Sequence, residues 1–184
     1  PSFHFSLAPP PSSLTMVEPN PHLYARLAEQ ADGATQDMDA RLSFPINTIN
    51  AFFPTDTLPP GKQYDAVVFT LVLCSVQDLH KTIEQARKLL KPGGRLVFLE
   101  HVCPPKYSAK YFAARVIGPL WTSFGDGCEL TRETEAAIRA FDWDAVELDR
   151  FDKTLPNHGM SLEWLANHII MGKATKEKKK KRKK

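Results

Sequence analysis

Cysteine is scarce in this sequence. The three residues, Cys74, Cys103 and Cys128, stand far apart, and no Cys-x-x-Cys occurs. The six histidines are also scattered, and no two share the spacing with which a helix presents metal ligands. We therefore expect neither a disulfide framework nor a zinc motif, and we predict no metal site. Such cysteine usage is typical of a reducing compartment, so we expect a cytoplasmic protein.

Long apolar runs are also missing, since none reaches the roughly 18 residues that a membrane span needs. The first residues, PSFHFSLAPPPSSL, lack the basic start of a signal peptide and the arginine of a transit peptide. No initiator Met precedes them, so we expect a fragment or a gene-model error. With 42% hydrophobic and 24% charged residues, the chain has the composition of a soluble globular domain.

Positive charge is lacking in the body of the chain, although the formal net charge is +3. The last twelve residues hold nine Lys or Arg and one Glu, which leaves the remainder about five charges negative. We therefore do not expect a basic nucleic-acid-binding face on the body. Runs of like charge repel one another, so we predict a disordered tail over 176–184. An acidic partner, an anionic surface or nuclear targeting are its alternative roles.

Strand patterns recur along residues 14–175. The strongest is the β-branched run Tyr64–Val76, which is nearly all apolar, as in a strand buried on both faces of a parallel sheet. Weaker strand patterns lie at 14–18, 40–53, 95–102, 145–152 and 168–175.

Helical patterns separate these strands, and we predict helices over 22–33, 78–91, 106–119 and 130–141. Asp78 is placed to cap the second of them. The apolar stripe of that helix is Leu79, Ile83, Ala86 and Leu90. We expect Gly33, then Pro92 with its glycine pair, and then Pro119 to end the first three helices, and Thr131 or Thr134 to cap the fourth.

The alternation of strands and helices predicts an α/β fold with a mostly parallel sheet. Ligands of such sheets bind outside the carboxyl ends of the strands. The residues expected there are Glu18, Asn50 with Ala51, Thr70 to Ser75, and Glu100 with His101. A carboxylate at the end of an early strand can accept hydrogen bonds from both ribose hydroxyls, so Glu18 indicates a nucleoside-bearing cofactor. The alternative for Glu18 is a solvated loop acid.

Three motifs occur in order along the chain: TLVLCSV at 70–76, LKPGGRLVFLEHV at 90–102 and FGDGCELTRET at 124–134. Together they resemble the class I S-adenosylmethionine-dependent methyltransferases, and more narrowly the methyltransferase-like thiol S-methyltransferases. The resemblance runs from about Thr15 to about Thr175. It implies a Rossmann-like, mostly parallel sheet with helices on both faces, and S-adenosylmethionine as cofactor. It also implies methyl transfer to a small apolar acceptor, a thiol first and a quinone-like carbon second.

The resemblance further implies roles for single residues. Glu18 would bind the ribose hydroxyls, and Asn50 and Ala51 would hold the adenine, although the family usually has an acid where Asn50 stands. Phe52 would stack on the adenine or belong to the core. Thr70 and Leu71 would lie where the chain runs beside the methionine part of the cofactor.

The family's first strand and its glycine-rich turn find no match here, since no glycine stands upstream of Thr15. We therefore expect a truncated methyltransferase domain over 14–175, behind a disordered leader over 1–13. Without that turn the chain is expected to bind the cofactor weakly or not at all. The hydrophobic N-terminal anchor of the thiol methylases also finds no match.

Four residues are candidates for the reaction itself. A thiol with a pKa of about 8.5 is already partly ionised at neutral pH. A base such as His101 would therefore assist its deprotonation without being essential. Glu100 would contact the substrate or make structural hydrogen bonds. Asp126 and Arg132 could pair across a substrate loop, whose other interpretation is a capped helix start. Cys128, with no His near it in the sequence, is expected to be a buried small apolar residue.

Aromatic residues gather between 111 and 124, namely Tyr111, Phe112, Trp121 and Phe124. They suit an apolar acceptor, although helical spacing of aromatics is more typical of a core. A second hypothesis is a non-catalytic remnant that acts as a binding module through its basic tail. A third, a nicotinamide-dependent oxidoreductase, needs the missing glycines too and has only Glu18 in its favour.

Overall fold

The computed structural model describes residues 11–37, 44–55, 57–152, 166 and 168–178. The chain divides into two compact units, Pro1–Pro60 and Gly61–Lys184. Within the described ranges, no helix combines the length and apolar character needed to cross a membrane. Residues 1–10 of the predicted leader and 179–184 of the predicted tail lie outside the described residues.

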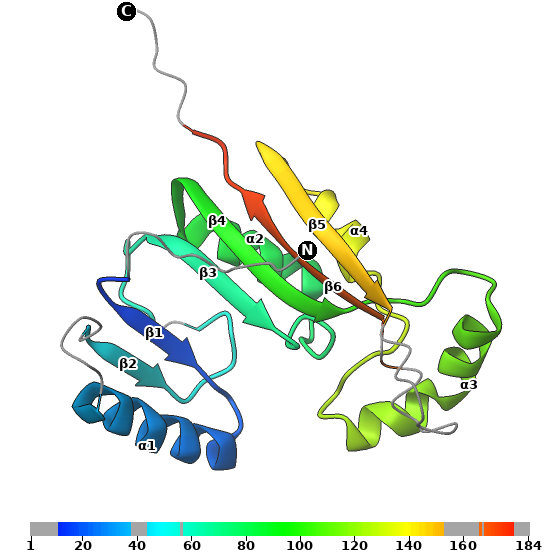
Figure 1. Ribbon diagram of the computed structural model, residues 1–184, viewed down its shortest axis with the longest axis horizontal. Coiled ribbons are helices and arrows are strands. Elements are labelled where there is room, and N and C mark those ends of the chain that lie inside the picture. Colours follow the sequence, from blue (N-terminus) through cyan, green and yellow to red (C-terminus); the bar gives the residue numbers. More distant parts are fainter. Residues whose placement is uncertain (1–10, 38–43, 56, 153–165, 167, 179–184) are drawn as a thin grey trace, which may run out of the picture. The chain divides into compact units, whose positions relative to one another are not determined.

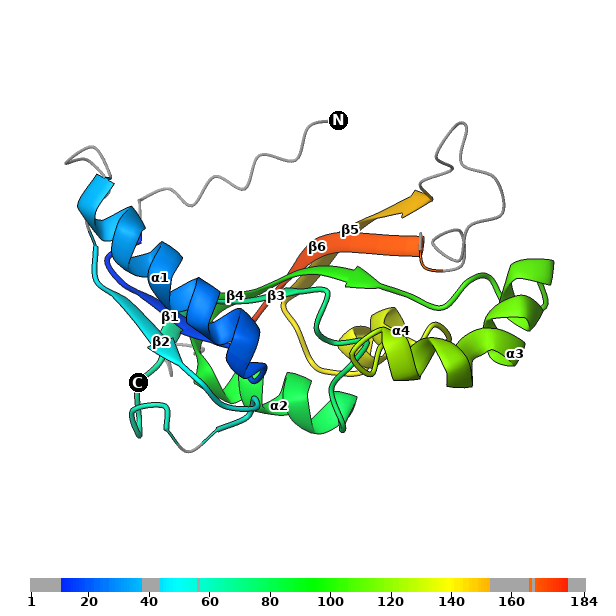
Figure 2. The ribbon, with the colours of Figure 1, turned by 90° about the horizontal axis from the view of Figure 1, so that it is seen from below.

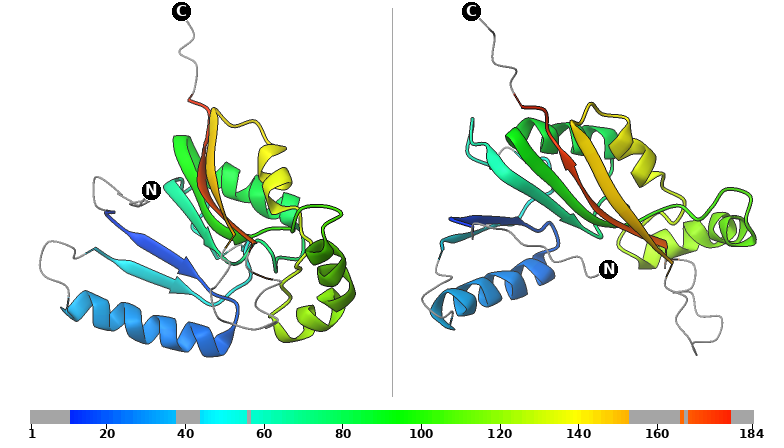
Figure 3. Two further views of the ribbon diagram at one scale, coloured as in Figure 1. Left: turned by 45° about the vertical axis from the view of Figure 1, so that its right-hand side comes forward. Right: turned by 45° about the horizontal axis from the view of Figure 1, so that its top comes forward.

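The first unit consists of β1 (Leu14–Val17), α1 (Pro21–Asp37) and β2 (Ile46–Ile49). β1 and β2 pair in parallel, with Leu14 opposite Ile46, and α1 packs along β2 (Figure 3). The prediction that Gly33 ends the helix is wrong, because α1 continues to Asp37. A single glycine costs a helix only about 1 kcal/mol relative to alanine, which is too little to end it.

The second unit holds a four-stranded sheet in the order β3 (Tyr64–Thr70), β4 (Leu90–His101), β6 (His168–Thr175), β5 (Ala145–Asp152), shown in Figure 1. β3 and β4 are parallel, and β6 is antiparallel to both of its neighbours. Only β6 therefore runs against the other strands of this sheet. The predicted α/β fold with a mostly parallel sheet is confirmed.

Helices α2 (Leu79–Leu89) and α4 (Thr134–Arg139) lie side by side on one face of this sheet (Figure 2). Asp78 caps α2 as predicted, since its carboxylate accepts a hydrogen bond from the N–H of Lys81 at 2.9 Å. The core between the helices and the sheet is fully or nearly fully buried and includes Ile83, Ala86, Leu90, Leu96, Phe98, Ile138, Ile170 and Ala174. Of the predicted stripe of the second helix, Ile83 and Ala86 face the core from α2. Leu79 is half-buried, and Leu90 is buried as the first residue of β4.

The Lys-Pro-Gly-Gly element belongs to the start of β4 rather than to the end of α2. The helix ends at Leu89, and residues 91–94 form an irregularity in the ladder, where Tyr64 pairs with Leu90 and Ala66 with Arg95. The prediction that Pro92 and the glycines end the helix is wrong by a few residues. A proline without an N–H and a glycine with φ of 80° (Gly93) are suited to such a bulge.

Two further helix boundaries differ from the predictions. Helix α3 (Ala109–Phe124) continues through Pro119, which lies inside it. The turn behind the proline is supported by the hydroxyls of Thr122 and Ser123, which donate to the carbonyls of Gly118 and Pro119.

The cap of α4 also differs, because Glu133 holds the cap position and makes no side-chain cap bond. Thr131 lies before the helix, and Thr134 is its first residue. The Thr134 hydroxyl donates to the carbonyl of His101 at 3.3 Å, so it serves the end of β4 instead of the helix.

Lys176, the first residue of the predicted tail, is held by the second unit. Its N–H donates to the carbonyl of Gly94 at 2.9 Å, which extends the line of β6. Its ammonium donates to the carbonyls of Arg87 and Leu90 at 2.7 and 2.6 Å. These carbonyls lie at the C-terminal end of α2, where a cation is favoured by the helix dipole.

Candidate active site

Two predicted site residues lie side by side at the carboxyl ends of β1 and β2. Glu18 follows β1 directly, and its N–H donates to the carbonyl of Ile49 at 3.0 Å. Asn50 follows β2, and its Nδ2 donates to the main-chain carbonyl of Glu18 at 2.8 Å. Because the two strands are parallel, their ends present both residues at one edge of the first unit.

The Glu18 carboxylate has room for a ligand. One oxygen, Oε1, accepts a hydrogen bond from the N–H of Asn20 at 2.8 Å, whereas Oε2 accepts none from the described residues. Phe52, two residues after Asn50, is 74% exposed, and Ala51 between them is half-buried. Phe52 was predicted either to stack on the adenine or to pack in a core. Its exposed ring does not pack in a core of the first unit.

In the second unit, β3 ends at Thr70, earlier than the predicted Val76. Leu71 has φ of 56°, a left-handed conformation that is unfavourable for a branched side chain. Its N–H still donates to the carbonyl of Leu99 at 2.8 Å. Thr70 and Leu71 are both exposed at the carboxyl end of the strand. Strained backbone of this kind is characteristic of functional turns.

Glu100 is completely buried at the end of β4. Its two oxygens accept the N–H groups of Val72 and Leu73, each at 3.0 Å. Burial raises the pKa of this carboxyl to about 7, against which the two backbone hydrogen bonds act. Glu100 was predicted either to contact the substrate or to make structural hydrogen bonds. In this structure it makes the hydrogen bonds, and no surface of its side chain is exposed for a substrate.

His101 follows Glu100 and lies between two cysteines. Its Nδ1 is 3.9 Å from Sγ of Cys74 and 3.7 Å from Sγ of Cys128. Both cysteines are buried and neither is in a disulfide, and His101 is half-buried. Cys128 is buried as predicted. No histidine lies near it in the sequence, but the fold brings His101 to it from 27 residues away.

The two thiols perturb each other. A hydrogen bond toward Cys128, together with burial, raises the pKa of Cys74 to about 12. The same hydrogen bond lowers the pKa of Cys128 to about 7, against the effect of burial. Cys128 therefore loses its proton near neutral pH, whereas Cys74 keeps its own.

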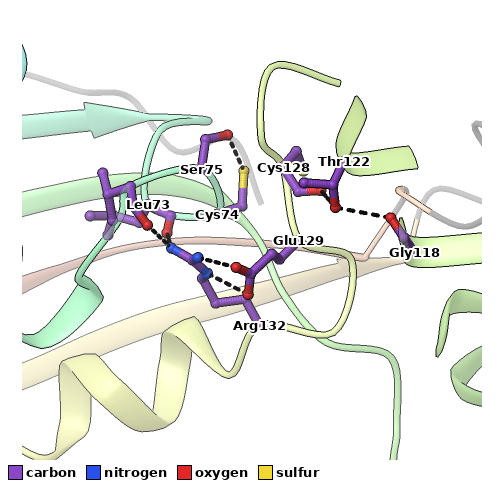
Figure 4. Close-up of polar contacts among 9 residues, drawn as sticks. Leu73, Cys74, Ser75, Gly118, Thr122, Cys128, Glu129 and Arg132 are labelled. Carbon is purple, nitrogen blue, oxygen red and sulfur yellow. Dashed lines mark hydrogen bonds and ion pairs between the residues drawn. The ribbon is translucent and has the colours of Figure 1, made fainter. Parts of the chain in front are cut away.

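Arg132 connects two loops of the second unit (Figure 4). Its guanidinium donates to the carbonyls of Leu73, at 3.1 Å, and Val76. It also forms a two-bond ion pair with Glu129, at 2.6 and 3.1 Å. The prediction that Arg132 pairs with Asp126 is therefore wrong: Asp126 is exposed in a tight turn with φ of 48°, and Glu129 lies closer along the loop.

The predicted aromatic group of α3 is not gathered into one pocket. Trp121 packs against the small cluster of Ala114 and Leu130, whereas Phe112 and Phe124 are 55% and 83% exposed. Tyr111 contacts Phe112 edge-on, with ring centroids 5.7 Å apart. These aromatics therefore give little support for an enclosed apolar acceptor site in this unit.

An open depression of about 380 Å³ lies between the segment after β4 and the start of α4. Its walls carry ion pairs of their own, between Lys106 and Glu133 and between Arg150 and Glu135. No predicted site residue lines it. We therefore place the candidate site at the strand ends and not in this depression.

The grouping of Cys74, His101 and Cys128 escaped the sequence analysis. Each residue comes from a different segment: the loop after β3, the end of β4, and the loop between α3 and α4. A ligand set drawn from three segments has no local spacing to recognise. One general rule could have brought Cys74 and His101 together: the carboxyl ends of adjacent parallel strands meet at one edge of the sheet. The same rule had been applied to Glu100 and His101.

Comparison with known proteins settles the family. A family model described as a methyltransferase domain matches residues 6–143. The chain belongs to this methyltransferase family. The rat protein named thiol S-methyltransferase TMT1B is 35% identical over 175 residues, and the human TMT1B is 33% identical over 174. Human thiol S-methyltransferase TMT1A is 31% identical over 175 residues. Each match covers 94% of this chain but only 66% of the relative's length.

Solved structures agree on the fold. An arsenic(III) S-adenosylmethionine methyltransferase from Chlamydomonas reinhardtii superposes with a TM-score of 0.61 at 14% identity, over 91% of this chain and 56% of that one. A putative methyltransferase from Bacillus halodurans gives a TM-score of 0.58 at 9% identity, over 90% and 83%. These similarities support the methyltransferase α/β fold.

Proposed function

We propose that this chain is the catalytic domain of an S-adenosylmethionine-dependent methyltransferase that acts on a small thiol. The observation that carries the proposal is the match to thiol S-methyltransferases over 94% of the chain. The paired strand ends of the first unit, with Glu18 and Asn50, support the cofactor. A carbon acceptor on a quinone-like ring is the second candidate, and no described residue favours it.

The residues of the first unit fit the adenosine part of the cofactor. The half-buried Glu18 keeps an oxygen available for ribose hydroxyls, and a carboxylate can accept two such hydrogen bonds. Asn50 and Ala51 would hold the adenine, and the exposed Phe52 ring is available for stacking. Contacts of Thr70 and Leu71, at the strained turn of the second unit, with the methionine part stay a prediction.

The reaction needs alignment, exclusion of water and removal of one proton. S-adenosylmethionine supplies a methyl group on a sulfonium sulfur. His101, at the carboxyl end of β4, would accept the proton of the acceptor thiol as it becomes a thiolate. Because a thiol with a pKa of about 8.5 ionises readily, loss of this base should slow the reaction without abolishing it.

Asp126 is proposed to lie at the entrance for the acceptor, because it is exposed on the turn that leads to Cys128. Arg132 would act on that entrance through Glu129 and the loop after β3, and not by direct contact. Its guanidinium has only a small exposed fraction and is committed to loop carbonyls. A binding role of the basic tail with acidic partners stays a prediction, as do cytoplasmic or nuclear locations.

The cofactor is tested by calorimetric titration of the protein with S-adenosylhomocysteine, the product form. Glu18→Ala is expected to weaken binding at least about tenfold, as removal of a charged hydrogen-bonding group does. Glu29→Ala, the same change on the exposed side of α1, is the matched control and should bind like the unaltered protein. No heat from a folded protein at millimolar ligand would refute the proposal.

The acceptor is tested by transfer of a labelled methyl group from S-adenosylmethionine to a panel of small thiols and quinols. Methylation of thiols, with none of quinols, is the expected result. The reverse selectivity would leave the cofactor assignment intact and replace the acceptor.

A further inference from the structure

Three side chains that bind soft and borderline metals converge at the edge of the second unit. The two Sγ atoms of Cys74 and Cys128 and Nδ1 of His101 all lie within 4.8 Å of one another. The separations from Nδ1 to the two sulfurs are 3.9 and 3.7 Å. No metal role is needed for the proposed methyl transfer, so the cluster requires an explanation of its own.

The two S···N separations are close to those of ligands around one tetrahedral ion, and the two sulfurs lie within 4.8 Å of each other. With Zn–S bonds of about 2.3 Å and Zn–N bonds of about 2.0 Å, tetrahedral angles place S and N about 3.6 Å apart and two sulfurs about 3.8 Å apart. The observed S···N distances exceed this value by only a few tenths of an ångström. Small side-chain rotations would therefore suffice to close the site on an ion.

Both cysteines of the cluster lie in the interior of the second unit. Their residues are only 1% and 6% exposed. A bound dication would displace the thiol protons to solvent.

The loops that carry the two cysteines are held in place by hydrogen bonds around the cluster. The carbonyl of Cys74 accepts the N–H of Glu129 at 2.9 Å, which joins the loop after β3 to the loop before α4. Arg132 bonds both loops, and Glu100 binds the backbone just before Cys74.

The ligands themselves are also oriented. Gly127, with φ of 80°, makes the turn that directs Cys128 inward, a conformation that disfavours other residues. The carbonyl of His101 is bound by Thr134. Such outer contacts orient ligands and strengthen metal binding.

We propose that Cys74, His101 and Cys128 form a three-ligand site for Zn²⁺. Three protein ligands with a free fourth position are the composition of reactive zinc sites, whereas purely structural sites are closed by four. Among the described residues, no fourth His, Cys, Asp or Glu joins the group. Water or an added small thiol would take the remaining position.

The site has a consequence for the reaction, and this step rests on the proposed function. A thiol bound at the fourth position would release its proton to solvent, because a metal-coordinated thiol is deprotonated. Nδ1 of His101 would then act as a ligand and not as the base, and the ion would perform the activation. The acceptor would be any small thiol able to reach this edge of the sheet.

The site is tested with Co²⁺ as a spectroscopic substitute for Zn²⁺. Reduced, chelator-treated protein is titrated with Co²⁺ while the thiolate-to-cobalt charge-transfer and d–d absorption bands are recorded. We expect bands typical of tetrahedral thiolate coordination that saturate at one equivalent and disappear when Zn²⁺ is added. Absence of thiolate bands, or octahedral bands alone, would overturn the proposal.

Variants identify the ligands. Cys74→Ser, Cys128→Ser and His101→Ala should each abolish or strongly weaken the bands. Cys103→Ser is the matched control, since this half-buried cysteine lies outside the cluster, and it should leave the titration unchanged. Loss of the bands in Cys103→Ser, or their persistence in any of the three cluster variants, would contradict the assignment.

A labelling experiment on the unaltered protein avoids any folding defect of the variants. Alkylation of each cysteine is followed by mass spectrometry with and without Zn²⁺, and Cys103 serves as the internal reference. Zn²⁺ should slow the modification of Cys74 and Cys128 by about tenfold or more relative to Cys103. Equal protection of all three, protection of none, or a Cys74–Cys128 disulfide that excludes Zn²⁺, would overturn the site.

The outcomes separate this proposal from the proposed function. Methyl transfer that survives complete metal removal, from a protein without cobalt bands, rejects the zinc site and keeps the thiol methyltransferase. Cobalt bands in a protein that neither binds S-adenosylhomocysteine nor methylates thiols keep the site and reject the function. A shift of the d–d bands on addition of a small thiol, with no cofactor present, would support thiol binding at the fourth position.

Discussion

Each of the two units presents a glutamate at the end of a strand, and the two side chains are used differently. Glu18 accepts one hydrogen bond from Asn20, two residues away, and stays half-buried with an oxygen to spare. Glu100 is completely buried and accepts two hydrogen bonds from a loop 27 and 28 residues earlier. The first acid is available to a ligand, whereas the second holds the protein together.

The same contrast holds for the cores of the two units. In the described part of the first unit Ala31 alone is buried, at 7% exposure, and the other buried apolar residues lie in the second unit. Burial of apolar surface is the main favourable contribution to folding. The second unit, which holds nearly all of the described core, is therefore the stable scaffold.

A matched pair of phenylalanines tests this contrast most strongly. Phe98 has no exposed surface in β4, whereas Phe52 in the first unit is 74% exposed. Phe98→Ala should lower the free energy of unfolding by about 3–5 kcal/mol, through lost burial and the cavity left behind. Phe52→Ala should change it by no more than about 0.5 kcal/mol. Urea denaturation followed by circular dichroism gives both values, and a similar loss in both variants would contradict the assignment of the scaffold.

The pH dependence of stability tests the buried acid. Because burial raises the pKa of Glu100 from 4.5 to about 7, the folded state binds the proton more tightly than the unfolded state. The contribution is fully present below pH 4.5 and is lost as the pH rises to about 7, at a cost of about 3 kcal/mol.

Glu100→Gln resembles the protonated acid and should remove this loss. The free energy of unfolding is measured at several pH values with a chelator present, and the slope of the variant is subtracted from that of the unaltered protein. Glu84→Gln, on the exposed face of α2, is the control and should keep the slope. An unchanged slope in Glu100→Gln would mean that the carboxyl is not the group responsible.

Two glycines test how closely the scaffold is packed. A Cβ on Gly172 in β6 would lie 2.6 Å from Cβ and 2.8 Å from Cα of Leu148 in β5, whereas one on Gly118 in α3 would meet nothing within 4 Å. Gly172→Ala should therefore destabilise the protein by about 1–3 kcal/mol. Gly118→Ala should stabilise it by about 0.5–1 kcal/mol, because alanine favours a helix. Thermal unfolding should show shifts of opposite sign, and equal shifts would contradict the close approach of β5 and β6.

Much of this fold was predictable from the sequence, because apolar patterning determines which segments are buried. The strand that begins at Tyr64, the buried side of the second helix and the last two strands were recognised from apolar patterning alone. Boundaries were harder, since they depend on tertiary contacts. Leu71 ends its strand through a left-handed backbone that no propensity predicts. Pro119 remains inside a helix that continues on the far side of it.

The candidate site was predictable only where one strand end supplies a residue. The positions of Glu18, Asn50 and His101 at strand ends were predicted because each residue follows an apolar run. The carbonyl partners of Arg132 and the cysteine neighbours of His101 come from loops that the sequence separates by 27 to 59 residues. Their positions depend on how loops fold back over the sheet, which local patterns do not encode.

The smallest expected effect concerns the edge of the scaffold, where the chain leaves β6. The Lys176 ammonium donates to the carbonyls of Arg87 and Leu90, and its partial burial lowers its pKa. Lys176→Ala should lower the free energy of unfolding by about 1 kcal/mol, the usual contribution of such hydrogen bonds. Lys178→Ala, an exposed change two residues on, should have almost no effect. If the two variants were equally stable in urea denaturation, Lys176 would belong to the basic tail, and the folded part of the second unit would end at Thr175.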